Sequence, residues 1–413
     1  MAGIYIHIPF CKSRCSYCAF YSTTQLELRQ RYVDALCKEL STLYTLHSTL
    51  DTVYLGGGTP SQLSPAQLEQ LFSHLTKVYP LPSLEGGAGG GSGWSEVTIE
   101  CNPDDITVPY AAALSRLPIN RVSMGAQTFD DQRLRFLNRR HTAAQVPLAV
   151  ERLRQAGIRN ISIDLMYGFP DETLCDWEYD IDRALALNVE HISAYCLMLE
   201  EGTSLYEKLK MKDERLKIEN EKIMIGAEEL ERQMYELLMD KLEAAGYEHY
   251  EISNWGLTPR PLQKERELKT YRSIHNSNYW KDVPYIGIGA AAHSYLPVGK
   301  PPLLGRFGGA GTRSWNISDL KEYIRRVENG ESPMEDYELI EGWTRYNDRI
   351  TVALRTCEGL DLTTLPDEQR DYCMKNARRF LDDGLLHEKA HHLVLTRKGL
   401  FVSDMIMSEL MKV

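Results

Sequence analysis

The sequence lacks any apolar run long enough to cross a membrane. Its longest candidate, YIGIGAAAHSYL from Tyr285, falls short of the roughly eighteen residues that a span needs and is interrupted by Gly287 and Gly289. No charged segment followed by an apolar one precedes Tyr5, so we expect no secretory leader. These absences predict a soluble protein without an integral membrane segment.

Cysteine is sparse, and basic residues are fewer than acidic ones. Nine cysteines in 413 residues are an odd number at low density, which predicts a reducing, cytoplasmic setting rather than a disulfide scaffold. The formal net charge of −11 argues against a broad nucleic-acid surface, and we expect no nucleic-acid partner. A local basic cluster, interpreted as a solvated helix face, is formed by Arg133, Arg135, Arg139 and Arg140.

The common nucleotide-binding signatures are also missing. No G-x-G-x-x-G opens the first helical segment, which excludes the usual dinucleotide fingerprint. The glycine-rich run GGGTP at Gly56–Pro60 is not followed by G-K-[ST], so it is not a phosphate-binding P-loop. Three glycines nevertheless let the backbone pass close to a ligand, and taken alone the run could equally be an ordinary turn.

A dense group of thiols stands near the start of the chain. Cys11, Cys15 and Cys18 have the spacing C-x3-C-x2-C and follow an alternating, strand-like segment. A structural zinc site usually closes with four ligands, and no second pair of Cys or His lies nearby. Three thiolates favour an iron–sulfur cluster that leaves one iron open. Buried free cysteines are the alternative, but Lys12 and Arg14 beside the thiols would lower the thiol pKa.

Strand-like and helical patterns alternate through the first half of the chain. This alternation implies parallel pairing, and six such units favour an α/β fold of the incomplete, TIM-like (β/α)6 barrel type over a doubly wound sheet. The six strand-like runs are Ile4–Ile8, Thr52–Leu55, Val97–Glu100, Asn120–Met124, Asn160–Leu165 and His191–Leu197.

The pattern of predicted strands, helices and motifs divides the chain into three parts. Residues 1–245 carry the barrel pattern and end in a charged helical stretch with an apolar stripe. Residues 246–330 form a connecting region that contains the hexapeptide HNSNYW, and residues 331–413 have the order of a smaller α+β, winged-helix-like domain. This last domain lacks a basic recognition helix, so we expect packing or partner contact rather than DNA binding. The run EGGAGGGSGW, Glu85 to Trp94, is expected to be a flexible loop.

The expected barrel gathers polar residues at one edge. Sites on such barrels lie where the parallel strands end, which brings Glu100, Gln127 and Asp164 to the face that holds the thiol loop and GGGTP. A carboxylate at Glu100 could accept hydrogen bonds from ribose hydroxyls. Each residue alone is more often a structural polar group, but together they outline an adenosine-sized pocket.

The thiol loop, with Tyr17 before its last cysteine, and GGGTP together resemble the radical S-adenosylmethionine (SAM) superfamily. YIHIPFC, GGGTP, ECNP, SMGAQTF, LNRRH and IDLMYGFP follow in the order of the oxygen-independent coproporphyrinogen III oxidase group, over roughly residues 4 to 200. The resemblance implies that Cys11, Cys15 and Cys18 ligate a [4Fe–4S] cluster. It also implies SAM contacts at Tyr5, Tyr17, Gly57, Gly58, Thr59, Glu100, Gln127, Arg139 and Asp164.

Two departures from the oxidases favour a neighbouring branch of the group. Oxidases carry a further cysteine two residues after the third ligand, where this chain has Phe20, and an N-terminal extension for which four residues leave no room. HNSNYW, from His275 to Trp280, is similar to the H-N-x-x-Y-W signature of the HemW haem chaperones, which hand haem to acceptor proteins.

The similarity to haem chaperones implies haem as a further cofactor, with His275 as its axial ligand, because neutral imidazole binds haem iron. The alternative for His275 is an ordinary hydrogen-bonded histidine in an aromatic loop. The implied function is transfer of haem to an acceptor protein. The alternative function is radical SAM decarboxylation of porphyrinogen propionates, for which an electron donor would be a further partner.

Overall fold

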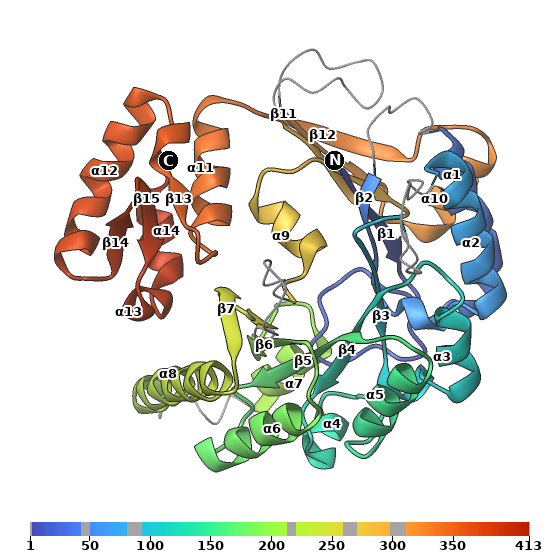
Figure 1. Cartoon of the computed structure of the whole chain (residues 1–413), viewed down its shortest axis with the longest axis horizontal. Helices are drawn as coiled ribbons and strands as arrows, with labels where there is room; N and C mark the ends of the chain where they lie inside the picture. Colours follow the sequence, from blue (N-terminus) through green and yellow to red (C-terminus); the bar gives the residue numbers. More distant parts are fainter. Residues whose placement is uncertain are drawn as a thin grey trace, which may run out of the picture.

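The computed structural model describes residues 2–42, 50–80, 93–212, 220–258, 271–297 and 311–412. Within these residues one curved sheet of twelve strands forms the body of the molecule, and a second sheet of three strands belongs to a smaller C-terminal unit. Figure 1 shows the body on the right and the smaller unit on the left. The predicted α/β class with a smaller C-terminal domain is confirmed.

Six parallel strands form the centre of the large sheet. Each pairs with the next in chain order, as expected for strands separated by helices. They match the six strand-like runs within a few residues, and they are buried along most of their length because both faces are covered. The strands are β1 (Ala2–Ile8), β2 (Leu50–Gly57), β3 (Glu96–Cys101), β4 (Arg121–Gln127), β5 (Asn160–Tyr167) and β6 (His191–Cys196).

Helices cover the outer face of these strands (Figure 1). In α2, Leu68, Leu71 and Leu75 are buried at helical spacing, and Ser64 caps the first turn by accepting from the backbone N–H of Gln67 at 3.3 Å. The outer helices are α1 (Arg29–Thr42), α2 (Pro65–Val78), α3 (Val108–Leu114), α4 (Asp131–Phe136), α5 (Gln145–Gln155) and α6 (Leu174–Ala186). Short 3-10 turns occur at Leu26–Leu28, Pro60–Gln62 and Pro103–Asp105.

The barrel remains open, because other strands extend both edges of its sheet. At one edge β6 pairs with β8 (Asn254–Leu257), which pairs with β7 (Tyr247–Glu251), both antiparallel. At the other edge β9 (Tyr285–Ile288) is parallel to β1, and antiparallel strands follow it. These are β10 (His293–Leu296), β11 (Gly311–Asn316) and β12 (Met334–Ile340).

Four further helices accompany the outer strands. They are α7 (Ser204–Lys212), α8 (Asn220–Ala244), α9 (Ile274–Trp280) and α10 (Leu320–Glu328). In the described second half of α8, Met234 and Leu238 of the apolar stripe predicted for the long charged segment are buried. The glycine-rich stretch after Glu85 falls outside the described residues up to position 92, while Trp94 is buried just before β3.

The C-terminal unit has its own hydrophobic core, which extends from Tyr346 to Leu410. Its element order and its strand order β13-β15-β14 are those of a winged helix. The elements are α11 (Gly342–Ala353), β13 (Leu360–Asp361), a 3-10 turn at Leu362–Thr364, α12 (Asp367–Asp382), β14 (Leu386–Lys389), β15 (His392–Leu395), α13 (Arg397–Leu400) and α14 (Ser403–Leu410). Because β12 belongs to the large sheet, we propose a unit boundary after Ile340 rather than at residue 331.

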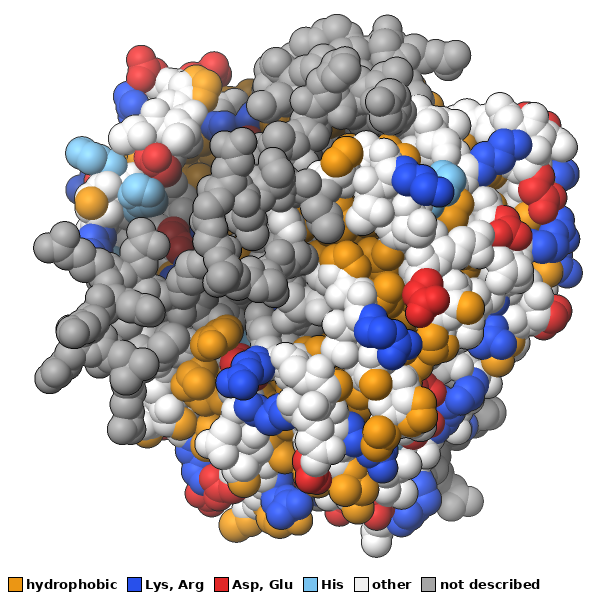
Figure 2. Space-filling model, turned by 45° about the vertical axis from the view of Figure 1, so that its right-hand side comes forward, with side chains coloured by type: hydrophobic (Ala, Val, Ile, Leu, Met, Phe, Trp, Pro, Cys, Tyr) orange, Lys and Arg blue, Asp and Glu red, His pale blue; other side chains and the backbone are white. Residues whose placement is uncertain are grey.

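Charges of both signs are mixed on the face shown in Figure 2, where lysines and arginines alternate with acidic side chains and apolar patches. Across the described residues, no helix combines the length and the apolar composition that a membrane crossing requires.

Candidate functional site

A pocket of about 520 Å³ lies at the carboxyl ends of the parallel strands. Parallel strands end at the same edge of a sheet, so side chains from distant parts of the sequence converge there. Eleven of the thirteen residues predicted for the site line this pocket. They are Cys11, Cys15, Tyr17, Cys18, Gly57, Gly58, Thr59, Glu100, Gln127, Arg139 and Asp164.

The three thiols occupy the loop that follows β1. The N–H of Cys11 donates to the carbonyl of Thr23 at 2.9 Å, and its Sγ lies 3.3 Å from the hydroxyl oxygen of Thr59. Nη1 of Arg139 donates to Sγ of Cys15 at 3.5 Å. Burial raises the pKa of Cys11 and of Cys18, so thiolates form there only with a compensating cation.

The three thiols are not gathered around a single point in this structure. Among the described residues, no three Cys, His, Asp or Glu side chains lie close enough together to hold a single ion. Thiolates that bind different irons of a cluster stand farther apart than the ligands of one ion.

Two glycines let the chain pass close to the pocket. Gly57 has a φ of +109°, and a Cβ there would lie 2.5 Å from Cε1 of His7. A Cβ on Gly58 would lie 2.6 Å from the backbone carbonyl carbon of Pro9. Larger residues would therefore displace β1 or the thiol loop, which explains the glycines of GGGTP.

Two partly buried carboxyl groups form another part of the wall. Glu100 accepts from the hydroxyl of Tyr54 at 2.8 Å and from the N–H of Gly57 at 3.2 Å. The pKa of Glu100 is raised to about 7, mainly by burial. The hydrogen bond from Tyr54 opposes this shift, and the negative charge of Asp164 adds to it. Burial also raises the pKa of Asp164, to which Ser123 donates at 3.4 Å. A pair of partly buried carboxyl groups favours a cationic ligand.

Arg139 places a positive charge between the thiols and the strands. Its Nη2 donates to the carbonyl of Gly125 at 2.6 Å and to Oδ1 of Asn102 at 2.7 Å. Its Nε is buried and has no hydrogen-bond partner within the described protein. An unsatisfied buried donor on a charged group beside an open pocket fits a bound acceptor.

Other lining residues were missed by the sequence analysis. Ser123 and Gly125 precede Gln127 on β4, and Tyr195 on β6 also lines the pocket. Gln127 has a φ of +66° where the register of β4 against β5 shifts, and this turns the end of the strand. Polar or small residues at every second position of a buried strand are the signal that could have identified this face.

Comparisons with known proteins agree along the whole chain. The family model of the radical SAM superfamily matches residues 5–184, and that of the HemN C-terminal domain matches residues 340–402. "Heme chaperone HemW" of Bacillus subtilis is 32% identical over 408 residues, which cover 97% of this chain and 96% of that protein. The protein of the same name from Lactococcus lactis is 34% identical over 78% of this chain and 73% of its own length.

The chain belongs to the HemW family. Membership in the radical SAM superfamily implies a [4Fe–4S] cluster and SAM as cofactors. Coproporphyrinogen III oxidase from Escherichia coli, a radical SAM enzyme of known structure, aligns with a TM-score of 0.72 at 19% identity over 100% of this chain and 90% of its own. That likeness shows the shared fold.

Tyr5, predicted as a SAM contact, is not among the lining residues of the pocket in this HemW protein. Its hydroxyl lies 3.0 Å from Nδ1 of His7, and its ring stacks on Tyr54 with centroids 6.2 Å apart. Tyr54 in turn holds Glu100. Tyr5 is therefore not part of the pocket lining. It packs against Tyr54, which donates a hydrogen bond to the lining residue Glu100.

His275, in the hexapeptide HNSNYW, has both ring nitrogens within hydrogen-bond distance of other side chains. His275 is the second residue of α9 and is 1% exposed. Its Nδ1 lies 2.8 Å from the hydroxyl of Thr52 and its Nε2 lies 2.9 Å from the hydroxyl of Tyr279, so both ring nitrogens are engaged. Burial lowers the pKa of His275 to about 3. In this structure His275 is a neutral, internally hydrogen-bonded histidine, and its role as an axial haem ligand stays a prediction.

Proposed function

We propose that this protein is a haem chaperone, which binds haem and passes it to an acceptor protein while carrying a [4Fe–4S] cluster and SAM. The observation that carries the proposal is the similarity to "Heme chaperone HemW" over 97% of the chain, through the barrel and the C-terminal unit alike. The convergence of thiols, glycines and partly buried carboxyl groups in one pocket supports the cofactor part of the proposal.

Cys11, Cys15 and Cys18 are the proposed cluster ligands. Each would bind one iron as a thiolate, and the fourth iron would stay open to SAM. The N–H of Arg139 at Cys15 would offset the negative charge of the bound thiolates. When bound, the cluster supplies one-electron chemistry, for which an electron donor is a further proposed partner.

The proposed SAM site occupies the remainder of the same pocket. The backbone of Gly57 and Gly58 with the hydroxyl of Thr59 would hold the amino-acid end, and Glu100 would accept from the ribose hydroxyls. The two partly buried carboxyl groups would favour the positive charge of the sulfonium. Tyr17, Gln127, Arg139 and Asp164 complete the proposed contacts.

Phe20 separates the proposed function from the oxidase alternative. It lines the pocket, 71% exposed, at the position where the resemblance places a further cysteine in the oxidases. A phenyl ring can neither bind iron nor transfer a proton. We therefore propose haem binding without porphyrinogen decarboxylation.

The test is a haem titration of the protein reconstituted without oxygen. One equivalent of haem per chain, seen as a shifted Soret band, is expected. Apomyoglobin then serves as a model acceptor, and a transfer rate that rises with apomyoglobin concentration indicates direct transfer rather than passive release. Incubation with coproporphyrinogen III, SAM and dithionite should give no loss of carbon dioxide by mass spectrometry. Decarboxylation, or a lack of haem binding, would contradict the proposal.

A further inference from the structure

A second pocket, of about 720 Å³, lies between the large sheet and the C-terminal unit. It shares no lining residue with the first pocket. One wall comes from α9, the turn after it and strands β9 to β11, and the other comes from α11 and residues 356–364. Its volume is within the range of about 300–1,000 Å³ that is typical of cofactor and ligand sites, which often lie between domains.

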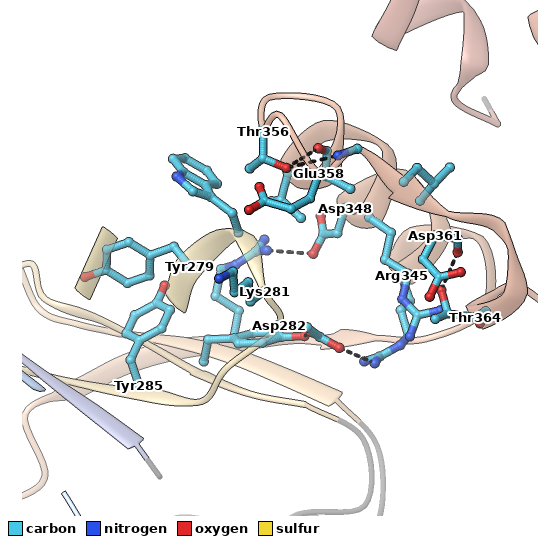
Figure 3. Close-up of a pocket in the computed structure, with 18 residues that line it drawn as sticks. Tyr279, Lys281, Asp282, Tyr285, Arg345, Asp348, Thr356, Glu358, Asp361 and Thr364 are labelled. Atoms are coloured by element: carbon cyan, nitrogen blue, oxygen red, sulfur yellow. Dashed lines mark hydrogen bonds and ion pairs between the residues drawn. The ribbon is translucent and has the colours of Figure 1, made fainter. Parts of the chain in front are cut away.

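One wall of this second pocket is aromatic. Tyr279 and Trp280 end α9, and Tyr285 and Tyr295 come from the neighbouring strands. The rings of Tyr279 and Tyr285 contact edge to face with centroids 4.6 Å apart, and Figure 3 shows them together on one side of the cavity. Such a surface suits a flat, apolar ligand.

Positive charge lies on both walls: Arg345 and Arg349 on α11 stand across from the aromatic wall, and Lys281 follows α9 on the aromatic side. Nη2 of Arg345 pairs with Asp282 at 2.6 Å, while its Nη1 is buried without a hydrogen-bond partner in the described structure. Two other lining cations, Lys281 and Arg349, form no ion pair within the described part of the chain. Four carboxylates also line the pocket, and three of them, Asp282, Asp348 and Glu358, are already paired with arginines. Beside these pairs the pocket offers two unpaired cations and one unsatisfied guanidinium donor.

Arg349 in particular is placed to accept an anion. Its Nη1 donates to the carbonyl of Thr364 at 2.9 Å. Burial, and next the positive charge of Arg345, lower the pKa of Arg349, while Asp282 is the largest opposing influence. Two neighbouring guanidinium groups repel each other, and a bound carboxylate would relieve this repulsion through charge-assisted hydrogen bonds.

We propose that the second pocket is the haem site, with the porphyrin against the tyrosine wall and its propionates at Arg349 and Lys281. Haem matches the pocket because it is a flat apolar ring with two carboxylates on one edge. The assignment rests on the proposed function, since it presumes that this chain binds haem. It also gives the HNSNYW signature a role without an iron–histidine bond.

In this arrangement His275 is a positioning residue. Its Nε2 holds the hydroxyl of Tyr279, and its ring stacks on Tyr54 with centroids 5.2 Å apart. Tyr279 and Trp280 reach the cavity, whereas His275 stays behind them. The signature therefore builds the aromatic wall of the pocket.

The first test compares ferric haem with haem dimethyl ester, in which both propionate charges are removed. Arg349→Gln should weaken haem binding about tenfold, as expected for loss of a charge-assisted hydrogen bond, and should leave ester binding unchanged. Arg378→Gln is the matched control, because Arg378 is exposed on α12 in the same unit and outside the pocket. Equal weakening of both ligands, or of neither, would overturn the assignment of the propionates.

The second test fills the cavity. Val352 lines the pocket from α11 and does not belong to the core of the C-terminal unit. Val352→Trp should therefore fill the pocket while the unit stays folded. Circular dichroism checks the folding. Loss of haem binding with unchanged iron content and SAM affinity is expected. Wild-type haem affinity in this variant would overturn the site. Absence of haem binding in the unmodified protein would instead contradict the proposed function.

Discussion

Glu100 is held in a position where burial opposes its ionisation. The pKa of its carboxyl is raised to about 7 from the ordinary 4.5, mainly because the group is removed from water. The ionised form can accept from two hydroxyls, whereas the protonated form is a poorer acceptor. Ligand binding at this residue is therefore linked to pH near neutrality.

We predict that SAM affinity falls as the pH is lowered through about 7, because protonation of Glu100 removes an acceptor from the ribose. Below this pH, SAM binding requires that Glu100 first lose its proton. Above it, Glu100 is already ionised and SAM affinity no longer changes with pH. Isothermal titration between about pH 6 and pH 8 measures the effect. Glu100→Gln should bind weakly at every pH. A wild-type profile without slope would contradict the role of Glu100.

We predict that Cys11→Ser, Cys15→Ser and Cys18→Ser each remove the cluster, because a three-thiolate site has no spare ligand. Iron and sulfide analysis after anaerobic reconstitution measures this. Cys175→Ser is the matched control, since Cys175 is an exposed free thiol that does not line the pocket. Full iron content in any of the three variants would remove that cysteine from the ligand set.

At the scale of elements, α9 depends on a carboxylate from β3. Glu96 accepts from the backbone N–H of Ile274 at 2.9 Å and of His275 at 3.0 Å, so it satisfies the first donors of the helix. Nε of Arg121 lies 4.0 Å from the same carboxylate, and both side chains are almost fully buried. The carboxylate of Glu96 therefore anchors the start of the helix that carries part of the tyrosine wall, and Arg121 supplies the nearby opposite charge.

We predict that Glu96→Ala lowers the free energy of unfolding by about 3–5 kcal/mol, because Arg121 would be left as an unpaired buried charge. Urea unfolding measures the change. Glu335→Ala, at an exposed position on β12, should change stability by at most about 0.5 kcal/mol. Haem affinity should fall with Glu96→Ala, since α9 loses its anchor. A stability change as small as that of the control would contradict the role of the pair.

At the scale of the whole molecule, partly exposed ion pairs join the C-terminal unit to the body, beside backbone hydrogen bonds from Ile252 and Cys357 and a ring contact of Phe401 with Tyr235. Arg345 pairs with Asp282 at 2.6 Å, and Arg313 pairs with Asp348 at 2.7 Å. Pairs that are partly exposed contribute roughly 0.2–1 kcal/mol each. A ligand bound between the two parts would therefore add substantially to their association.

We predict that haem slows amide hydrogen exchange in α9 and α11, because a ligand between them must leave before either can open. Mass spectrometry of peptides from these helices measures the protection. Peptides from α2, which lies on the outer face of the barrel, are the internal control and should not change. Protection by haem confined to the thiol loop would show that haem binds in the first pocket.

The sequence by itself determined the order of strands and helices, and the edge of the sheet at which the predicted site lies. Alternating strands and helices imply a parallel sheet, and parallel strands bring their ends to one edge. For this reason Cys11, Glu100 and Asp164 could be assigned to one pocket although they are far apart in the chain. The spacing of the thiols likewise restricts the chemistry of the loop before any fold is known.

Only the tertiary structure decided what depends on partners distant in sequence. Strands β7 to β12 have no local signal for the edge they join, because edge pairing depends on which backbone groups remain free. The sequence left His275 between a haem ligand and a hydrogen-bonded histidine, and its burial against Thr52 and Tyr54 follows from the docking of α9 on β2. The second pocket exists only where α11 packs across from α9, since its walls come from segments that no sequence pattern connects.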